Sequence, residues 1–216
     1  MTKTITVKGV GKASASPDLV VLTMALQSKN KDYEKAMRLA SESIAQLNES
    51  LEAVGFERKS LKTTAFNVYS DYRRKKDGSG ESVFAGYIIS HDLKLEFALD
   101  PERLAKALSV VGNCASRPRI SVAFTVKDTS AINDEMLRSA AENAKRKAEI
   151  LCSASGKELG ELLSIDYNWG EFNFYSDTRY ALAEDCMVAA SPKSSIDFEP
   201  DDIEVSDTVT FIWEIK

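Results

Sequence analysis

Residues 130–160 read SAINDEMLRSAAENAKRKAEILCSASGKELG, and this stretch predicts a long helix that packs against a sheet. Apolar or small residues recur every four positions, at Ile132, Met136, Ala140, Ala144, Ala148 and Cys152. Helical periodicity places them on one stripe, with charged residues largely on the other faces. Because the stripe is rich in alanine, another backbone can approach it closely. We expect a hydroxyl of Thr129 or Ser130 to cap the start of this helix and Gly156 to end it.

The N-terminal residues 5–14 read ITVKGVGKAS and alternate apolar and polar side chains, as a strand does. Gly9 and Gly11 interrupt the pattern, which predicts either a β-bulge or a close approach by another backbone. The tripeptide Ser16-Pro17-Asp18 is a turn signal, and residues 19–27 form a second alternating strand. The sequence therefore predicts an N-terminal hairpin.

Residues 31–54 place apolar side chains at steps of three and four, which predicts an amphipathic helix. Its stripe is compatible with a coiled coil or with burial on the protein's own sheet, and we expect burial. Residues 61–72 and 83–99 are strand-like, and they flank the polar segment 73–81, where two glycines permit a reversal. A long β-hairpin is therefore expected after this helix.

This second hairpin carries most of the residues that we expect at an interface. Aromatic residues gather across it, where they either hold the register or form a binding surface: Tyr69, Tyr72, Phe84 and Tyr87. A basic run lies at its tip: Arg73, Arg74, Lys75 and Lys76. We interpret the run as a solvated tip, with a nucleic-acid or anionic-lipid patch as the alternative. A long hairpin with a charged tip projects readily, so it is the first candidate for contact between subunits.

The second half of the chain continues with helices and strands. Asp100-Pro101-Glu102 has the sequence of a helix start, and residues 120–126 alternate as a strand. Residues 161–169 and 203–215 are also strand-like. The segment between them, 170–202, is predicted to be irregular. Its aromatic residues include three further interface candidates: Phe172, Phe174 and Tyr175.

The predicted order is β-β-α-β-β-α-β-α-β-β. Hairpins alternate with helices in this order, which favours a two-layer α+β fold with helices on one face of largely antiparallel sheets. A chain of 216 residues can bury one substantial core. We expect a single domain over 1–216, in which 1–55 and 61–112 form two β-β-α sub-units.

The composition is that of a soluble globular protein, with 44% hydrophobic residues, 28% charged residues and a net charge of −5. An acidic chain lacks the positive surface that general nucleic-acid binding requires. No run approaches the roughly 20 apolar residues of a membrane-spanning helix, and no apolar signal segment follows Met1. The three cysteines form no C-x-x-C pair, which fits a reducing compartment. We therefore expect a cytoplasmic protein, unless a signal peptide has been removed from the chain, with no nucleic-acid partner and no membrane span.

Motifs for catalysis or cofactor binding are absent from the sequence. The only histidine, His91, stands next to Asp92 in a strand, and no motif places a nucleophile beside it, so we expect a structural role. The Gly9-Val10-Gly11 segment lacks the remainder of a dinucleotide fingerprint. The acidic cluster at 201–204 lacks the glycine and final glutamate of a calcium loop. We expect no cofactor, no metal ion and no catalytic residue.

Several stretches together resemble the SIMPL-domain family. They are ITVKGVGKASASPD at 5–18, LKTT at 61–64, Gly86-Tyr87, AKRKAEIL at 144–151, GKELG at 156–160 and IEVSDTVTFIWEI at 203–215. The resemblance covers nearly the whole chain and implies a two-layer α+β fold and, as in bacterial members, assembly into large ring- or channel-like oligomers. Many bacterial relatives are exported, whereas this chain shows no signal peptide. The family has no established catalytic residues, so none are transferred.

Two functions are compatible with these observations. We expect a non-catalytic, self-associating scaffold or protein-interaction protein that forms a homo-oligomer, because the sequence offers a long hairpin and an aromatic-rich loop but no catalytic pattern. The alternative is a small-ligand-binding module or an unrecognised enzyme with a cleft near 170–202. A concave pocket that holds a carboxylate or His91 with a shifted pKa would favour the alternative.

Overall fold

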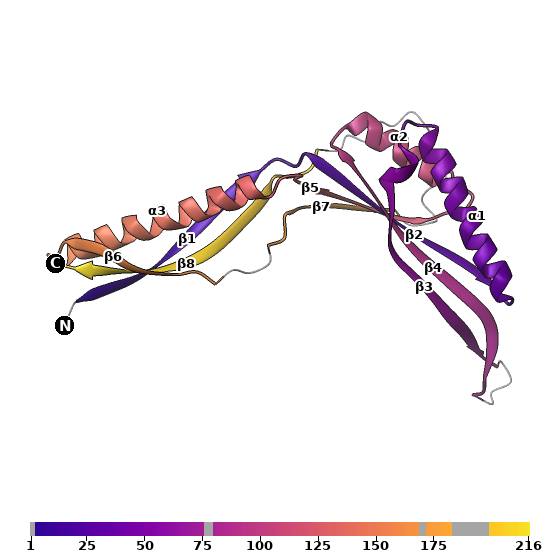
Figure 1. The fold of residues 1–216 in the computed structure, drawn as a ribbon, viewed down its shortest axis with the longest axis horizontal. Coiled ribbons are helices and arrows are strands. Elements are labelled where there is room, and N and C mark those ends of the chain that lie inside the picture. Colours follow the sequence, from indigo (N-terminus) through magenta and orange to yellow (C-terminus); the bar gives the residue numbers. More distant parts are fainter. Residues whose placement is uncertain (1–2, 76–79, 169–171, 183–198) are drawn as a thin grey trace. The chain divides into compact units, whose positions relative to one another are not determined.

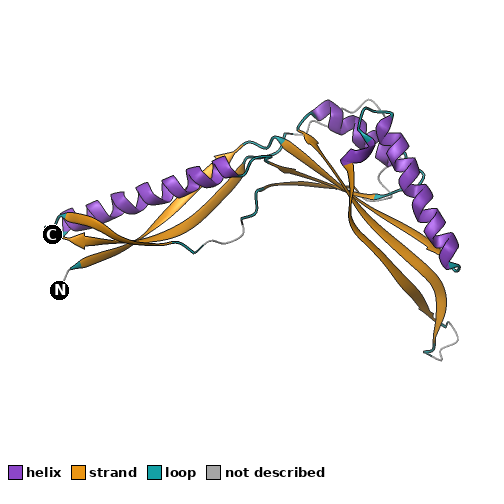
Figure 2. Ribbon diagram, viewed as in Figure 1, coloured by secondary structure: helices purple, strands orange, loops and turns teal. Residues whose placement is uncertain are grey.

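The computed structural model describes residues 3–75, 80–168, 172–182 and 199–216, and it confirms the two-layer α+β fold. The elements are β1 (Thr4–Ala15), β2 (Leu19–Asn30), α1 (Tyr33–Glu52), β3 (Leu61–Arg74), β4 (Ser82–Ala98), α2 (Pro101–Gly112), β5 (Arg119–Thr125), α3 (Ser130–Ala154), β6 (Leu159–Asp166), β7 (Tyr175–Leu182) and β8 (Ile203–Ile215) (Figures 1 and 2). The predicted order is confirmed. Strand β7 is an addition, since it lies in the segment 170–202 that was expected to be irregular.

The chain forms two compact units, each assembled from separate stretches of sequence. The first unit comprises residues 1–18, 125–177 and 200–216, and it contains a sheet with the strand order β1-β8-β6. The second unit comprises residues 19–124 and 178–199, and it contains most of a sheet with the order β3-β4-β2-β5-β7. Neither unit coincides with the sub-units 1–55 and 61–112 expected from the sequence.

Strands β1 and β2 do not form the N-terminal hairpin that the sequence predicts. β1 pairs antiparallel with β8, and β2 pairs antiparallel with β4. The turn at residues 16–18 therefore carries the chain out of one sheet and into the other. Asp18 fixes this turn, because its N–H donates to the Thr125 carbonyl oxygen at 3.1 Å and its carboxylate accepts from the Lys127 N–H at 2.7 Å. The turn signal predicted the change of direction but not the partner of either strand.

Helix α3 lies along β1 and β8 and buries the whole predicted stripe, from Ile132 to Cys152 (Figure 1). Gly9 and Gly11 permit this close approach. A Cβ atom on Gly9 would lie 2.0 Å from the carbonyl oxygen of Ala140, and one on Gly11 would lie 2.1 Å from that of Met136. Of the two interpretations of these glycines, the close backbone approach is confirmed. No register shift interrupts the pairing of β1 with β8.

The outer edge of β1 is closed by polar side chains of the same helix. Three hydrogen bonds do this: Val10 N–H to Asn143 Oδ1 at 3.1 Å, Lys12 N–H to Ser139 Oγ at 3.2 Å, and Lys147 Nζ to Lys8 O at 3.1 Å. The helix residues are four apart and the strand residues two apart. These spacings match, because four helical residues rise about 6 Å and two strand residues about 6.7 Å.

In the second unit, α1 and α2 pack on the sheet through apolar faces that the sequence indicated. The helix residues buried in the main core of this unit are Leu47, Leu51, Leu104, Ala107 and Val111, and they meet β2, β4 and β5. Helix α1 also buries Ala36 and Ala40, so burial on its own sheet is confirmed. Helices α1 and α2 therefore both pack on a face of this sheet, as in a two-layer α+β fold.

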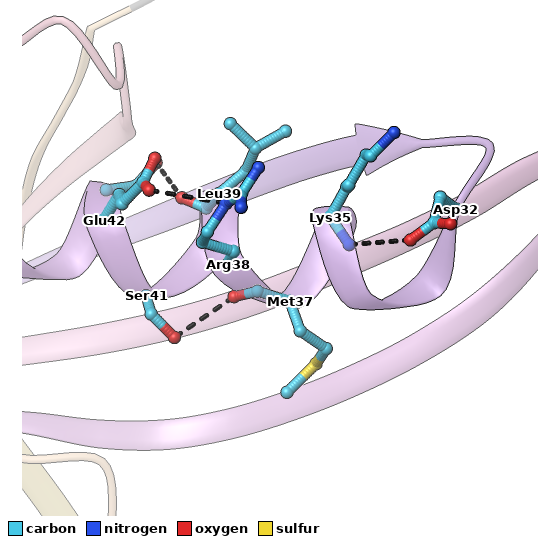
Figure 3. A network of polar contacts seen from close by, with 8 residues as sticks. Asp32, Lys35, Met37, Arg38, Leu39, Ser41 and Glu42 are labelled. Carbon is cyan, nitrogen blue, oxygen red and sulfur yellow. Dashed lines mark hydrogen bonds and ion pairs between the residues drawn. The ribbon is translucent and has the colours of Figure 1, made fainter.

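Polar side chains make local contacts at the start of α1 and along its surface. Asp32 caps α1 by accepting from the Lys35 N–H at 3.0 Å (Figure 3). Within α1, the Ser41 hydroxyl donates to the Met37 carbonyl oxygen at 3.1 Å, and Arg38 pairs with Glu42 at 3.7 Å (Figure 3). These surface contacts each contribute little, because they are exposed to water.

Two of the predicted helix ends are confirmed and one is wrong. Asp100 caps α2 as expected, accepting from the N–H groups of Glu102 and Arg103 at 2.9 and 3.1 Å. Gly156 follows α3 with a φ of 66°, which glycine adopts without strain. The side chain of Thr129 does not cap α3, however. Asp128 accepts from the Ser130 N–H at 2.9 Å instead, and this hydrogen bond lowers the pKa of Asp128.

Replacing Gly9 tests the close approach of α3. We expect Gly9→Ala to lower the free energy of unfolding by about 1–3 kcal/mol, because the added methyl group overlaps a helix backbone that cannot yield locally. The matched control is Ser14→Ala, at an exposed position of the same strand, which should change stability by no more than about 0.5 kcal/mol. Urea denaturation measures both. Equal stabilities of the two variants would contradict the packing described.

Candidate interaction surface

The β3–β4 hairpin exposes a group of apolar side chains. Strand β3 is the edge of its sheet, and α1 packs on β2 and β4 and leaves most of β3 uncovered. The exposed apolar residues of the hairpin are Phe66 (45%), Val68 (39%), Tyr69 (54%), Tyr72 (62%), Val83 (38%) and Phe84 (47%). We call these six residues the hairpin surface.

A continuous row of aromatic rings runs from the start of α1 onto this hairpin. Edge-to-face contacts join Tyr33 to Tyr87, Tyr87 to Phe84, and Phe84 to Tyr72, with ring centroids 5.5, 5.2 and 5.8 Å apart. A register shift at Asp71/Tyr72 brings Tyr72 opposite Phe84. The predicted cross-strand clustering is thus found for Tyr72, Phe84 and Tyr87, whereas Tyr69 lies opposite Ile88.

The basic residues at the hairpin tip are partly balanced by nearby acids. Arg73 lies 3.5 Å from the Asp71 carboxylate, which also pairs with Lys29. Lys75 pairs with Glu81. Arg74 is exposed and makes no ion pair within the described part of the chain. Lys76, the fourth member of the predicted run, lies outside the described residues.

The second group of expected interface aromatics belongs to the first unit. Phe172 and Phe174 are half-buried, with ring centroids 6.0 Å apart, and they pack on the cluster that contains Ile132 and Met136. Tyr175 is 42% exposed. Packing therefore accounts for Phe172 and Phe174, and Tyr175 is the accessible member of this group.

Strand β6 exposes apolar side chains that sequence reasoning missed. Leu162, Leu163 and Ile165 are 47%, 51% and 54% exposed, and Ile150 and Leu151 at the end of α3 are 61% and 52% exposed. We call the three strand residues the β6 surface. Alternation of apolar and polar residues predicts a strand, but it does not tell whether a helix covers that strand.

His91 is buried in the second sheet and has an unusual environment. Its Nε2 lies 2.7 Å from the Thr63 hydroxyl, its ring contacts Phe66 edge to face at 5.2 Å, and its Nδ1 has no partner among the described residues. Burial lowers the pKa of His91, and the negative charge of Asp92 opposes this in part. Burial therefore favours the neutral imidazole over the charged form.

Two residues of the acidic cluster at 201–204 accept hydrogen bonds from serine hydroxyl groups. Asp202 accepts from the Ser16 hydroxyl at 2.7 Å, and the Asp201 carbonyl oxygen accepts from the Ser176 hydroxyl at 2.7 Å.

Across the described ranges, no three His, Cys, Asp or Glu side chains are grouped so as to hold a metal ion. No helix in the described part of the chain is long and apolar enough to cross a membrane. The cleft expected near 170–202 falls largely on residues 183–198, outside the described residues.

Comparison with known proteins gives a family match over nearly the whole chain. The SIMPL family model, described as a protein of unknown function (DUF541), matches residues 5–213. The 26 kDa periplasmic immunogenic protein of Brucella melitensis is 23% identical, with 98% of this chain and 84% of the relative covered. The uncharacterized protein YggE of Escherichia coli is 22% identical, with coverages of 98% and 83%. YggE of Edwardsiella ictaluri is also 22% identical, with coverages of 98% and 87%.

These relatives contradict the expected cytoplasmic location. The proteins of Brucella melitensis and Brucella abortus are both named periplasmic. The expectation of a reducing compartment rested on cysteines that form no motif. Cys114 and Cys152 are free thiols buried in the protein, and a buried cysteine behaves as a small apolar residue in any compartment.

The lowered pKa of His91 predicts a pH-dependent stability. The unfolded chain binds a proton near the ordinary pKa of about 6.5, while the folded chain resists protonation, so acidification favours unfolding. We expect the wild-type protein to lose stability relative to a His91→Gln variant as the pH falls below about 6.5, and no difference in slope above it. Unfolding free energies of both proteins across this range measure the effect. Parallel curves would show that His91 titrates as in the unfolded chain.

Proposed function

The chain belongs to the SIMPL family, a family of unknown function, and from this premise we propose that it is a non-catalytic, self-associating scaffold or protein-interaction protein. The observation that carries the proposal is the hairpin surface, which presents four aromatic rings and two valine side chains to solvent on the edge strand β3 and its neighbour β4. Apolar side chains that gather at the surface of a soluble protein are typical of interaction sites.

Two physical properties support association at this surface. The outer edge of β3 has backbone groups that no described strand pairs, and such an edge accepts a further strand. Tyrosine and phenylalanine bury large areas while losing few side-chain rotamers, which makes them effective at protein interfaces. The names of the Brucella relatives support a periplasmic location for this chain as well.

Substituting two rings of the hairpin surface tests the proposal. We expect the wild-type protein to form a discrete oligomer at micromolar concentration. Tyr72→Ser combined with Phe84→Ser should raise the dissociation constant at least about tenfold, which corresponds to about 1.4 kcal/mol. Light scattering coupled to size exclusion, over a range of protein concentrations, measures the mass of each protein.

The matched control is Leu39→Ser, an exposed apolar residue on α1 of the same unit. It should assemble as the wild type does. A folded wild-type protein that stays monomeric at micromolar concentration would refute self-association. Equal losses in the double variant and in the control would refute the role of the hairpin surface.

A further inference from the structure

The sheet edges of the two units differ in whether the chain itself closes them. The edge of β1 is occupied by Ser139, Asn143 and Lys147 of α3. At the opposite edge of the same sheet, β6 has no described neighbour, and β3 has none at the edge of its own sheet. Neither strand contains proline, and β6 contains no lysine or arginine. Both edges thus lack the proline, and β6 also the basic side chains, that commonly prevent an edge from pairing with another strand.

Both open strands carry apolar side chains on the helix-bearing face of their sheet. In the first unit, Leu162 pairs with Trp213 and Ile165 with Phe211, and both partners are buried beneath α3. Paired residues of neighbouring strands point to the same face. Leu162 and Ile165 therefore face the helix side, yet about half of each remains exposed, at 47% and 54%.

The second unit repeats this arrangement. Phe66 pairs with His91 and Val68 with Ile89, and both partners are buried in the sheet. Phe66 and Val68 thus belong to the face that α1 covers over β2 and β4, but they are 45% and 39% exposed. If β6 joined β3, Leu162 and Ile165 would lie beside Phe66 and Val68 on one face of the combined sheet. Each pair of side chains would then shield part of the other from water.

The charges at the two edges are complementary. Glu158 immediately before β6 and Glu161 near its start are exposed and make no ion pair within the described residues. Arg73 and Arg74 lie at the end of β3 and are also exposed. An antiparallel pairing brings the start of one strand to the end of the other, so the acidic start of β6 comes to lie near the basic end of β3.

We propose that β6 of one copy of this chain pairs antiparallel with β3 of a second copy. This inference rests on the proposed self-association and names both sides of the contact. Each copy presents one β6 edge and one β3 edge, so the contact is heterologous and can repeat from copy to copy. Repetition generates a ring if the rotation closes and a filament if it does not.

Charge exchange between the two edges tests the pairing. The first variant combines Glu158→Lys with Glu161→Lys, and the second combines Arg73→Glu with Arg74→Glu. We expect each variant alone to lose assembly, with at least a tenfold rise in the dissociation constant, and its circular dichroism spectrum to match the wild type. An equimolar mixture of the two, and a chain that carries all four substitutions, should assemble again. Light scattering coupled to size exclusion gives the masses.

The alternative outcomes separate this inference from the proposed function. If the glutamate variant assembles as the wild type does, β6 is not part of the interface and the inference fails, while self-association through the hairpin surface stands. If only the arginine variant loses assembly, two β3 edges meet each other and the inference again fails. If neither the mixture nor the fourfold variant assembles, the proposed charge contact is wrong. A monomeric wild-type protein would remove the proposed function and the inference together.

Discussion

The close contact between the β1 backbone and helix α3 governs the architecture of the first unit. Gly9 and Gly11 have no side chain to separate the two elements, and the helix meets them with Ala140 and Ala144. Because the helix is so near, its polar side chains reach the outer N–H and C=O groups of β1. Because it is centred on β1 and β8, the third strand, β6, is left without cover. One steric constraint thus closes one edge of the sheet and exposes the other.

In the second unit, a helix also covers the inner strands of the sheet and leaves an edge strand uncovered, but it does so with different side chains. Helix α1 buries Ala36 and Ala40 at its start and Leu47 and Leu51 toward its end, over β2 and β4. The long edge strand β3 lies beyond this cover and is exposed on both faces. Among the described residues, β6 and β3 are therefore both open edge strands with exposed apolar side chains on the helix side of their sheet. This shared property links the hairpin surface to the β6 surface.

The sequence predicted local structure more accurately than it predicted pairing or exposure. The four-residue repeat from Ile132 to Cys152 determined the buried stripe of α3, because helical periodicity depends on near neighbours in sequence. Gly9 and Gly11 indicated either a bulge or a close approach, and the sequence did not identify the helix backbone at Met136 and Ala140 as their neighbour. The partner of β1 lies about 200 positions away along the chain and that of β2 about 60 to 80, and no turn signal specifies either. Tyr72 and Phe84 were expected at a surface. Leu162 and Ile165 were not, because their alternation is the same in a covered strand.

The most direct test compares the hydrogen exchange of edge amides in the monomeric and the assembled protein. The amides of Val10 and Lys12 should exchange slowly in both states, because α3 accepts their hydrogen bonds within one chain. The outward amides of β3 and β6 should exchange rapidly in dilute monomer and become protected on assembly, since each edge then gains a partner strand. Equally rapid exchange at β3 and β6 in both states would contradict the account. Rapid exchange at Val10 and Lys12 would contradict the closed edge on which it depends.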